Sequence, residues 1–198
     1  MKANLLIHGA VALSVALSGM AVATHAFAAG GGDYGATWTS DGKLELPKDF
    51  HSWVFLGAPL TPHALNGGAA GFPEYHNVYV HPAAYKAYRQ SGRWPEGTVL
   101  LKELQLTREA RHADGSSDEA SGRGYFPAQL NGIDISVKDS QRFAGTSGWG
   151  FFNFGHHAPP YAKLAEPAPK DACAGCHEAN ATEDMVFTKF YAPILNAK

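Results

Sequence analysis

The sequence predicts an α+β fold that is mainly antiparallel β sheet with short helices. Of the 198 residues, 12% are aromatic, 17% are charged, 22 are Gly and 12 are Pro. Aromatic residues favour strands, and frequent Gly and Pro interrupt long helices. Long stretches with a helical period of 3.6 residues are also missing ahead of residue 173. The sequence therefore disfavours disorder, a coiled coil and a helical bundle.

Runs of β-branched and aromatic residues between turn residues predict the strands. They are His51–Leu56, His76–Val80, Thr98–Leu106, Gly124–Phe126, Ile133–Val137 and Trp149–Phe154. Helix starts are predicted at Thr61–Pro62, at Pro82, and at Glu183 in a segment that runs to Tyr191 with Asn180 as its capping residue. Residues 108–122 are predicted to form a polar loop and residues 159–169 a Pro-rich connector.

The first 28 residues have the features of an export signal. Lys2 precedes a largely apolar stretch, residues 5–22, which is followed by the small-residue pattern Ala26-Phe27-Ala28. This pattern is typical of a signal peptide cleaved after Ala28. A retained membrane anchor is the alternative, but Gly and Ser interrupt the apolar stretch. The expected organisation is a signal peptide at 1–28, an N-terminal extension at 29–50 and one globular domain at 51–198, in the periplasm.

The distribution of charged and apolar residues argues against nucleic-acid and membrane partners. The chain has 16 basic and 18 acidic residues, and no run of Lys or Arg forms the basic stripe that nucleic acid requires. No segment after residue 28 approaches the length needed to span a membrane.

The two cysteines form the string Cys173-Ala-Gly-Cys176-His177, which is the C-x-x-C-H attachment site of a c-type haem. This spacing lets two thiols bond to one porphyrin edge while the adjoining imidazole binds the iron. A redox disulfide would need a thioredoxin-like βαβ setting, and a zinc site would need two further ligands at regular spacing. The sequence therefore predicts one covalent haem c per chain.

The sixth position on the iron decides what such a haem does. After cleavage Met185 is the only methionine, and it lies eight residues past His177. A residue so near the proximal ligand is expected to pack beside the haem rather than cross to its far face. An open iron is therefore favoured over the His/Met ligation of an electron carrier.

Lys102 is the unusual residue of the strand Thr98–Leu106. Side chains alternate across a strand, so Lys102 shares a face with Leu100, Leu104 and Leu106. Such a lysine commonly extends to solvent, but over an apolar haem wall desolvation would favour its neutral, nucleophilic amine.

Six strings, in this order and spacing, carry a resemblance to a known family. They are Trp53–Gly57, Phe72–Tyr79, Gly97–Leu104, Lys138–Phe143, Gly148–Gly155 and the closing string from Cys173 to Ala181. From about His51 to Ala197 the chain resembles the cytochrome P460 family. The resemblance implies a periplasmic, mostly antiparallel-β, homodimeric c-type cytochrome with five-coordinate haem. It also implies a covalent bond from a lysine to the porphyrin, and Lys102 is the matching position.

Family members with that bond resemble small hydroxylamine oxidoreductases, which yield nitrous oxide or nitrite and pass electrons to an external acceptor such as a soluble cytochrome. A sister group, the β-type cytochromes c prime, lacks the bond and binds nitric oxide under a phenylalanine-lined cap. In the family an acidic residue shortly upstream of the haem string can act as the distal base. Glu166 and Asp171 are the candidates here, and a solvated position in the connector is the alternative for each.

Several other residues have both a functional and an ordinary structural interpretation. His156 and His157 are a possible metal pair, but adjacent residues after a strand point apart, and a surface loop is favoured. Phe72, Phe126 and Phe151 are candidates for a distal cap or for core packing. No role is assigned to Glu74 and Tyr75.

Three functions from different classes therefore remain open. Hydroxylamine oxidation is expected with a cross-linked Lys102. Nitric oxide binding is expected with the same open iron but no cross-link. Electron transfer is expected if Met185 or a histidine closes the iron.

Overall fold

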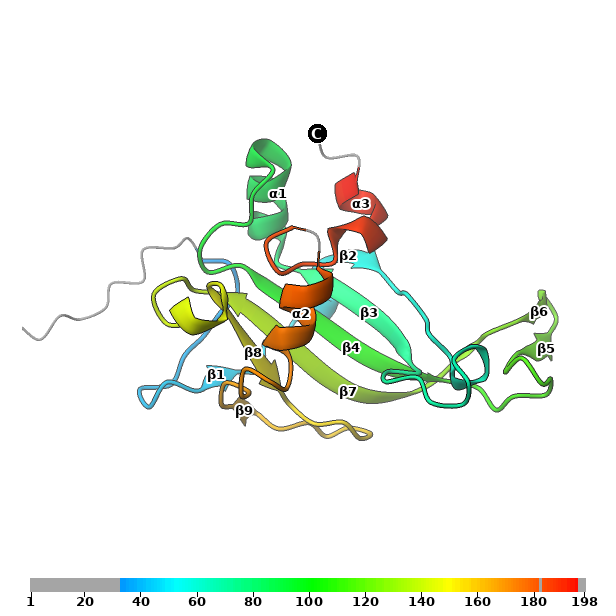
Figure 1. Cartoon of the computed structure of the whole chain (residues 1–198). Coiled ribbons are helices and arrows are strands. Elements are labelled where there is room, and N and C mark those ends of the chain that lie inside the picture. The colour runs from blue at the N-terminus through cyan, green and yellow to red at the C-terminus, as the bar shows by residue number, and fades with distance from the viewer. Residues whose placement is uncertain (1–32, 182, 196–198) are drawn as a thin grey trace, which may run out of the picture.

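The centre of the molecule is a five-stranded antiparallel sheet with the order β2-β3-β4-β7-β8. The computed structural model describes residues 33–181 and 183–195 (Figure 1). The strands are β2 (Val54–Gly57), β3 (Tyr75–Val80), β4 (Val99–Thr107), β7 (Pro127–Lys138) and β8 (Trp149–Asn153). The hairpin of β5 (Ser117–Glu119) and β6 (Gly122–Gly124) is inserted between β4 and β7 and projects away from the sheet (Figure 1). The prediction of a mainly antiparallel α+β fold is confirmed.

Helices are short and lie around this sheet. The α-helices are α1 (Pro82–Ser91), α2 (Ala174–Asn180) and α3 (Ala192–Leu195), and the 3-10 helices are η1 (Phe50–Ser52), η2 (His63–Leu65), η3 (Ala144–Thr146) and η4 (Thr188–Phe190). The strands β1 (Leu44–Glu45) and β9 (Leu164–Ala165) pair as a separate ribbon. In Figure 1, α2 lies in front of the sheet, and it contacts β8.

The two faces of the sheet pack against different parts of the chain. On one face, named here the α2 face, β3, β4 and β8 bury Val80, Leu100 and Phe151 together with Ala174 of α2. The opposite face buries a second set of strand residues, namely Val99, Leu101, Ile133, Ile135, Val137 and Phe152. Leu44 of β1 is fully buried in that second cluster. The segment expected to be an N-terminal extension, 29–50, therefore contributes to the core from its described part, and the expected signal peptide lies outside the described residues.

Most predicted elements are confirmed with small changes at their ends. Periodicity and capping located β3, α1, β4 and β8 within two residues at each end. The strand predicted at 133–137 is the second half of the longer β7, and Pro82 stands at the first position of α1, with Gly92 as the left-handed residue after it. None of the helices in the described residues is both long and apolar enough to cross a membrane.

The predicted strand at 51–56 is wrong in its first half. Ser52 donates hydrogen bonds from its backbone N–H and its hydroxyl to the carbonyl oxygen of Asp49, at 3.0 and 2.7 Å. These bonds form the turn η1, so the extended chain begins only at Val54. The short helix predicted after Thr61–Pro62 is a single 3-10 turn, η2.

The predictions of a loop at 108–122 and a strand at 124–126 are wrong, because the structure has the β5–β6 hairpin at 117–124 instead. Arg123 donates to Asp114 and to the hydroxyl of Ser116 at 2.8 and 2.7 Å, and Arg108 pairs with Glu119. These polar contacts order a segment whose composition is typical of a loop. Residues 125 and 126 connect the hairpin to β7 rather than forming a strand.

The helix predicted at Glu183–Tyr191 is also wrong. Asp184 and Met185 have positive φ angles of 50° and 63°, and Glu183 pairs with Val186 across a tight turn. Only η4 within this segment is helical, and Asn180 is the last residue of α2 rather than the cap of a following helix.

Candidate functional site

The helix α2 presents the two cysteines and the histidine of the attachment string together. Cys173 is its N-cap residue, and Cys176 and His177 follow three and four positions later. Residues at this spacing lie on one side of a helix. Cys173 is half-buried and Cys176 is exposed, and burial raises the pKa of the Cys173 thiol. The short helix therefore brings two thiols and one imidazole to the same edge of the α2 face.

His177 has the environment of a metal-binding imidazole. Its Nδ1 lies 2.7 Å from the carbonyl oxygen of Met185, and because a carbonyl only accepts, Nδ1 carries the proton. The rings of Phe151 and Phe187 flank the imidazole, with centroids at 4.6 and 4.9 Å. Burial lowers the pKa of His177, which favours the neutral ring. Nε2 is then the basic nitrogen, as iron ligation requires.

Met185 belongs to the same side of the site as His177. Its side chain is 9% exposed and packs in the cluster of the α2 face, which confirms the expectation that it fills the core. Its backbone holds the imidazole of His177 by the bond given above.

Lys102 lies in a row of side chains that runs across the α2 face. Val78, Lys102, Asp134 and Asn153 are successive cross-strand neighbours on β3, β4, β7 and β8. The Nζ atom of Lys102 lies 3.0 Å from Oδ2 of Asp134, and the Lys102 side chain is one quarter exposed. The amine of Lys102, which was expected on an apolar wall, therefore forms an ion pair with Asp134 in this structure.

Asp134 is the carboxylate at the centre of this row. Besides Lys102, it accepts from Nδ2 of Asn153 at 2.7 Å and lies 3.1 Å from Nε2 of His156. Burial by itself raises the pKa of Asp134, but the Lys102 cation and the bond from Asn153 outweigh it, so the pKa lies below its usual value. Asp134 is therefore ionised at neutral pH.

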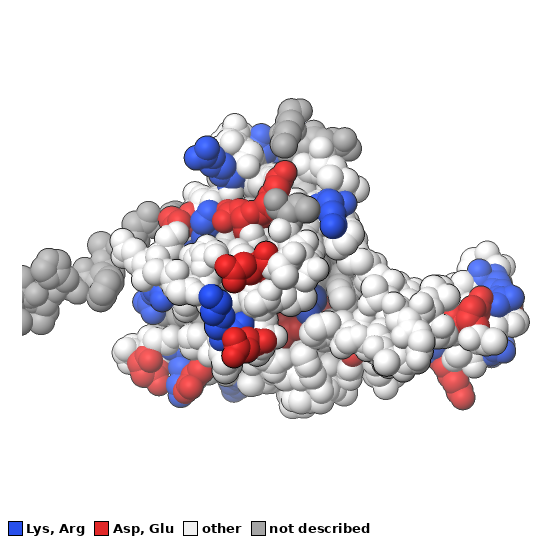
Figure 2. All heavy atoms as spheres, viewed as in Figure 1, with Lys and Arg blue, Asp and Glu red and all other residues white. Residues whose placement is uncertain are grey.

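Phe72 covers the lysine. The Nζ atom of Lys102 lies 4.0 Å from the centroid of the Phe72 ring, which is within the range of a cation–π contact. The same ring meets His76 and His156 edge to face, at 5.7 and 6.0 Å. Phe72 is 42% exposed, so it offers a free apolar surface beside the amine. On the face seen in Figure 2, the surface between α2 and the β5–β6 hairpin is largely uncharged.

A partly buried histidine and a buried carboxylate lie at the β3 end of this site. Glu74 is 7% exposed, and its Oε1 accepts from Nδ2 of Asn131 at 2.8 Å. The other oxygen of Glu74 and Nε2 of His76 are buried without hydrogen-bond partners among the described residues. Burial, with a smaller effect from the Lys102 cation, lowers the pKa of His76 to about 4. The site thus contains polar groups that nothing within the described chain satisfies.

The lowered pKa of the partly buried His76 predicts a loss of stability in mild acid. In the unfolded chain the pKa of this ring has its ordinary value of 6.5, whereas in the folded chain the pKa is about 4. The unfolded state therefore binds more protons between these values, and stability falls as pH is lowered from 6.5 to 4, by up to about 3 kcal/mol. Thermal unfolding at a series of pH values checks this against His76→Phe. The variant is expected to lose the His76 part of the decline, and an unchanged decline would contradict the prediction.

The two acidic residues predicted from the connector lie elsewhere. Glu166 is exposed and its Oε1 lies 3.4 Å from Nζ of Lys43, at the β1–β9 ribbon. Asp171 is exposed in the turn before α2. Neither contributes to the row of Lys102 and Asp134.

The remaining sequence candidates divide between the site and its surroundings. Phe72 and Phe151 are in the site, whereas Phe126 is not among its contacts. His156 bonds to Asp134 and His157 bonds to the carbonyl of Ala158, so the two rings separate as expected. No cluster of three metal-ligating side chains is found in the part of the chain that the structure describes. The hydroxyl of Tyr75 donates to the carbonyl of Tyr125 at 2.6 Å and holds the segment that follows the hairpin.

Asp134 and His76 are the site residues that sequence reasoning missed. Asp134 alternates with Ile133 and Ile135, and such alternation is typical of a strand with one solvated face. Only the pairing of β4 with β7, which sets Asp134 opposite Lys102, distinguishes it from a surface carboxylate. The signal available in the sequence was a lysine and an aspartate, each among apolar residues of a predicted strand, which could pair if the two strands were neighbours.

The parts of the site lie close enough to influence one another. The charges of Lys102 and Asp134 act on the pKa values of both Cys173 and His177. Four features of the site fit a haem attached beside α2. They are a neutral imidazole with a basic Nε2, two thiols one helical turn apart, flanking aromatic rings and unsatisfied polar groups. The fold and the site thus have the features expected of a haem protein built on an antiparallel sheet.

The comparison with protein families identifies the particular family. The model of the cytochrome P460 family matches residues 47–188, which is more than half of the chain. The chain belongs to the cytochrome P460 family. No curated protein matches it.

Proposed function

We propose that this protein is a periplasmic c-type cytochrome that oxidises hydroxylamine to nitrous oxide or nitrite and passes the electrons to an external acceptor cytochrome. Membership of the cytochrome P460 family supports a haem protein. The observation that carries the finer proposal is the position of Lys102, whose amine lies on the α2 face with Asp134 and acts on the pKa values of Cys173 and His177. We further propose a homodimer.

Cys173 and Cys176 would hold the haem through thioether bonds, and His177 would be its protein ligand. When bound, this group supplies the electron acceptor and the open coordination position for hydroxylamine. The Met185 side chain packs in the core cluster, and its backbone carbonyl accepts from His177, so Met185 would not serve as a second ligand. This arrangement disfavours the electron-carrier alternative.

Lys102 would be the residue whose amine bonds to the porphyrin. Such a bond would replace one N–H bond of the amine and one C–H bond of the porphyrin, so its formation would need a two-electron oxidant such as a peroxide. The carboxylate of Asp134, 3.0 Å from the amine, is ionised and accepts the amine proton that must leave before nitrogen can bond to carbon. Phe72, stacked over the amine, restricts its movement.

Asp134 also takes the role of the distal base. Every electron withdrawn from hydroxylamine is accompanied by a proton, which must be accepted near the open position of the iron. The Asp134 carboxylate is ionised, partly exposed and held by Asn153 and His156, so it accepts a proton and can relay it to solvent. Glu166 and Asp171 are exposed on other elements and serve as comparisons.

We expect Asp134→Asn to lower the kcat for hydroxylamine oxidation by about 100-fold, because a proton acceptor is lost while the shape is kept. Steady-state turnover with an excess of an artificial electron acceptor measures this. Glu166→Gln and Asp171→Asn remove carboxylates outside the row and are expected to retain wild-type rates. Equal losses in all three variants, or none in Asp134→Asn, would contradict the assignment.

Nitric oxide binding without turnover is the second candidate function. It is favoured by the ion pair that engages the Lys102 amine and by the exposed ring of Phe72, which resembles an apolar cap. The absorption spectrum of the ferrous protein separates the two functions. A cross-linked haem gives a spectrum displaced from that of ordinary five-coordinate haem c, and an ordinary spectrum with rapid nitric oxide binding would favour the second function.

A further inference from the structure

The turn after α2 contains an unusual backbone. Asp184 and Met185 are the central residues of a tight turn closed by a bond of 2.9 Å from the N–H of Val186 to the carbonyl of Glu183. Both central residues have positive φ, as in a type I′ turn, which favours Asn, Asp or Gly. Aspartate tolerates this conformation, but methionine does not favour it. Contacts elsewhere must therefore hold Met185 in this backbone conformation.

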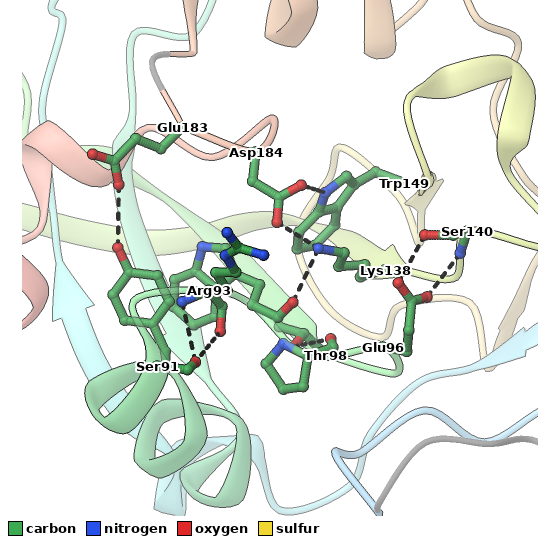
Figure 3. A network of polar contacts seen from close by, with 12 residues as sticks. Ser91, Arg93, Glu96, Thr98, Lys138, Ser140, Trp149, Glu183 and Asp184 are labelled. Carbon is green, nitrogen blue, oxygen red and sulfur yellow. Dashed lines mark hydrogen bonds and ion pairs between the residues drawn. The ribbon is translucent and has the colours of Figure 1, made fainter.

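The side chain of Asp184 supplies such contacts. Its Oδ2 accepts from Nζ of Lys138 at 2.6 Å and its Oδ1 from Nε1 of Trp149 at 3.2 Å (Figure 3). Lys138 and Trp149 are cross-strand neighbours on β7 and β8, and Trp149 is fully buried. Lys138 is fixed in turn by a bond of 3.0 Å to the carbonyl of Trp94. The carboxylate thus joins the turn to two adjacent strands at once.

Polar contacts have particular weight here because the turn is not fully packed on its outer side. A cavity of about 310 Å³ is lined by Tyr88, Gly92, Arg93, Trp94, Lys138, Glu183 and Asp184. Figure 3 shows Asp184 pointing toward Lys138 and Trp149. The Met185 side chain packs into the core on the other side.

The carbonyl that this turn presents is the one that accepts from Nδ1 of His177, at 2.7 Å. We propose that Asp184 is a positioning residue that, through Lys138 and Trp149, fixes the Met185 carbonyl on His177 and so sets the orientation and basicity of the proximal imidazole. This inference rests on the haem attachment at His177 given under Proposed function. A hydrogen bond to the far nitrogen of a ligating histidine strengthens its donation to the metal. Without Asp184 the bond lengthens, and the imidazole becomes a weaker ligand.

The test measures the ligand bond itself in the haem-loaded protein. In Asp184→Ala we expect the iron–histidine stretching band in the resonance Raman spectrum of the ferrous protein to move to lower frequency. We also expect the reduction potential to rise, because weaker donation stabilises the ferric state less. Asp184→Asn, which keeps one acceptor oxygen for Trp149, is expected to give a smaller shift in the same direction.

Asp184→Gly separates the contacts from the backbone preference. Glycine adopts positive φ without strain but cannot bond to Lys138 or Trp149. If the contacts act, Gly and Ala variants shift alike; if Gly behaves as wild type, the turn conformation alone matters and the proposal is overturned. Should the Ala variant fail to fold, the Gly and Asn variants decide in the same way.

Tyr88→Phe is the matched control at the same turn. It removes the bond of 3.3 Å from the Tyr88 hydroxyl to Glu183 and leaves the Asp184 contacts in place. We expect its iron–histidine band and potential to stay at the wild-type values. An equal shift in Tyr88→Phe, or wild-type values in every Asp184 variant that carries haem, would overturn the proposal. Wild-type protein without covalent haem would instead refute the haem attachment on which it rests.

Discussion

Replacing Lys102 with Leu is expected to abolish hydroxylamine oxidation and to return the absorption spectrum to that of ordinary five-coordinate haem c. The substitution removes the only amine on the row formed by Val78, Lys102, Asp134 and Asn153. Folding is expected to persist because Leu100 and Leu104 already make this strand face apolar, and because Asp134 keeps its contacts with Asn153 and His156. Haem content should therefore match the wild type while turnover is lost.

Lys102→Arg separates the charge of this residue from its amine. Arginine keeps a cation for Asp134 and a planar group to stack on Phe72, but it lacks the primary amine that the proposed bond requires. We expect this variant to lose oxidation as completely as Lys102→Leu. Retained activity in Lys102→Arg would mean that charge, and not a bond to the porphyrin, is what the reaction requires.

Peptide masses give the direct evidence for the bond. Trypsin does not cut after a lysine whose amine is bonded, so the wild type should yield the peptide 94–108 joined through haem to the peptide 171–189. In Lys102→Arg the chain should be cut at residue 102 and the haem peptide should be found alone. Separate peptides in the wild type would favour nitric oxide binding over oxidation.

The sequence predicts the framework of this molecule better than its turns. Strands such as β3 and β4 consist of β-branched and aromatic runs whose alternation is decided locally, and Pro82 and Gly92 mark both ends of α1. The hairpin at 117–124 and the turn at Asp184 are instead held by polar contacts between distant residues. Local composition predicts a loop in the first segment and a helix in the second, because it contains no information about the distant residues that form these contacts.

The same distinction applies to the candidate site. The attachment string is a local pattern, so Cys173, Cys176 and His177 could be read directly, and Lys102 could be recognised as polar on an apolar strand face. Asp134 and His76 depend on which strands pair and in which register. The proximity of Glu166 to the haem string along the chain is misleading, since the chain turns away into the β1–β9 ribbon before α2 begins.

Replacing Cys173 or Cys176 with Ser is expected to give protein whose haem is extractable or missing. Serine does not form a thioether, so each single variant keeps at most one covalent link, and the double variant keeps none. The Cys173 variant is expected to be the less stable of the two. Its side chain is half-buried against the core of the α2 face, whereas Cys176 is exposed.

The loss of haem should also lower the stability of the whole domain. Phe151 and Phe187 pack around His177, and Glu74 and His76 have buried polar atoms without partners among the described residues, so we expect the proposed haem to complete part of this interior. Denaturing gels stained for haem peroxidase activity and thermal unfolding of the same samples measure the two effects. Ala174→Gly, which weakens α2 without touching a thiol, is the control and should retain covalent haem. A double variant that keeps its haem on a denaturing gel and unfolds at the wild-type temperature would refute the attachment through these cysteines.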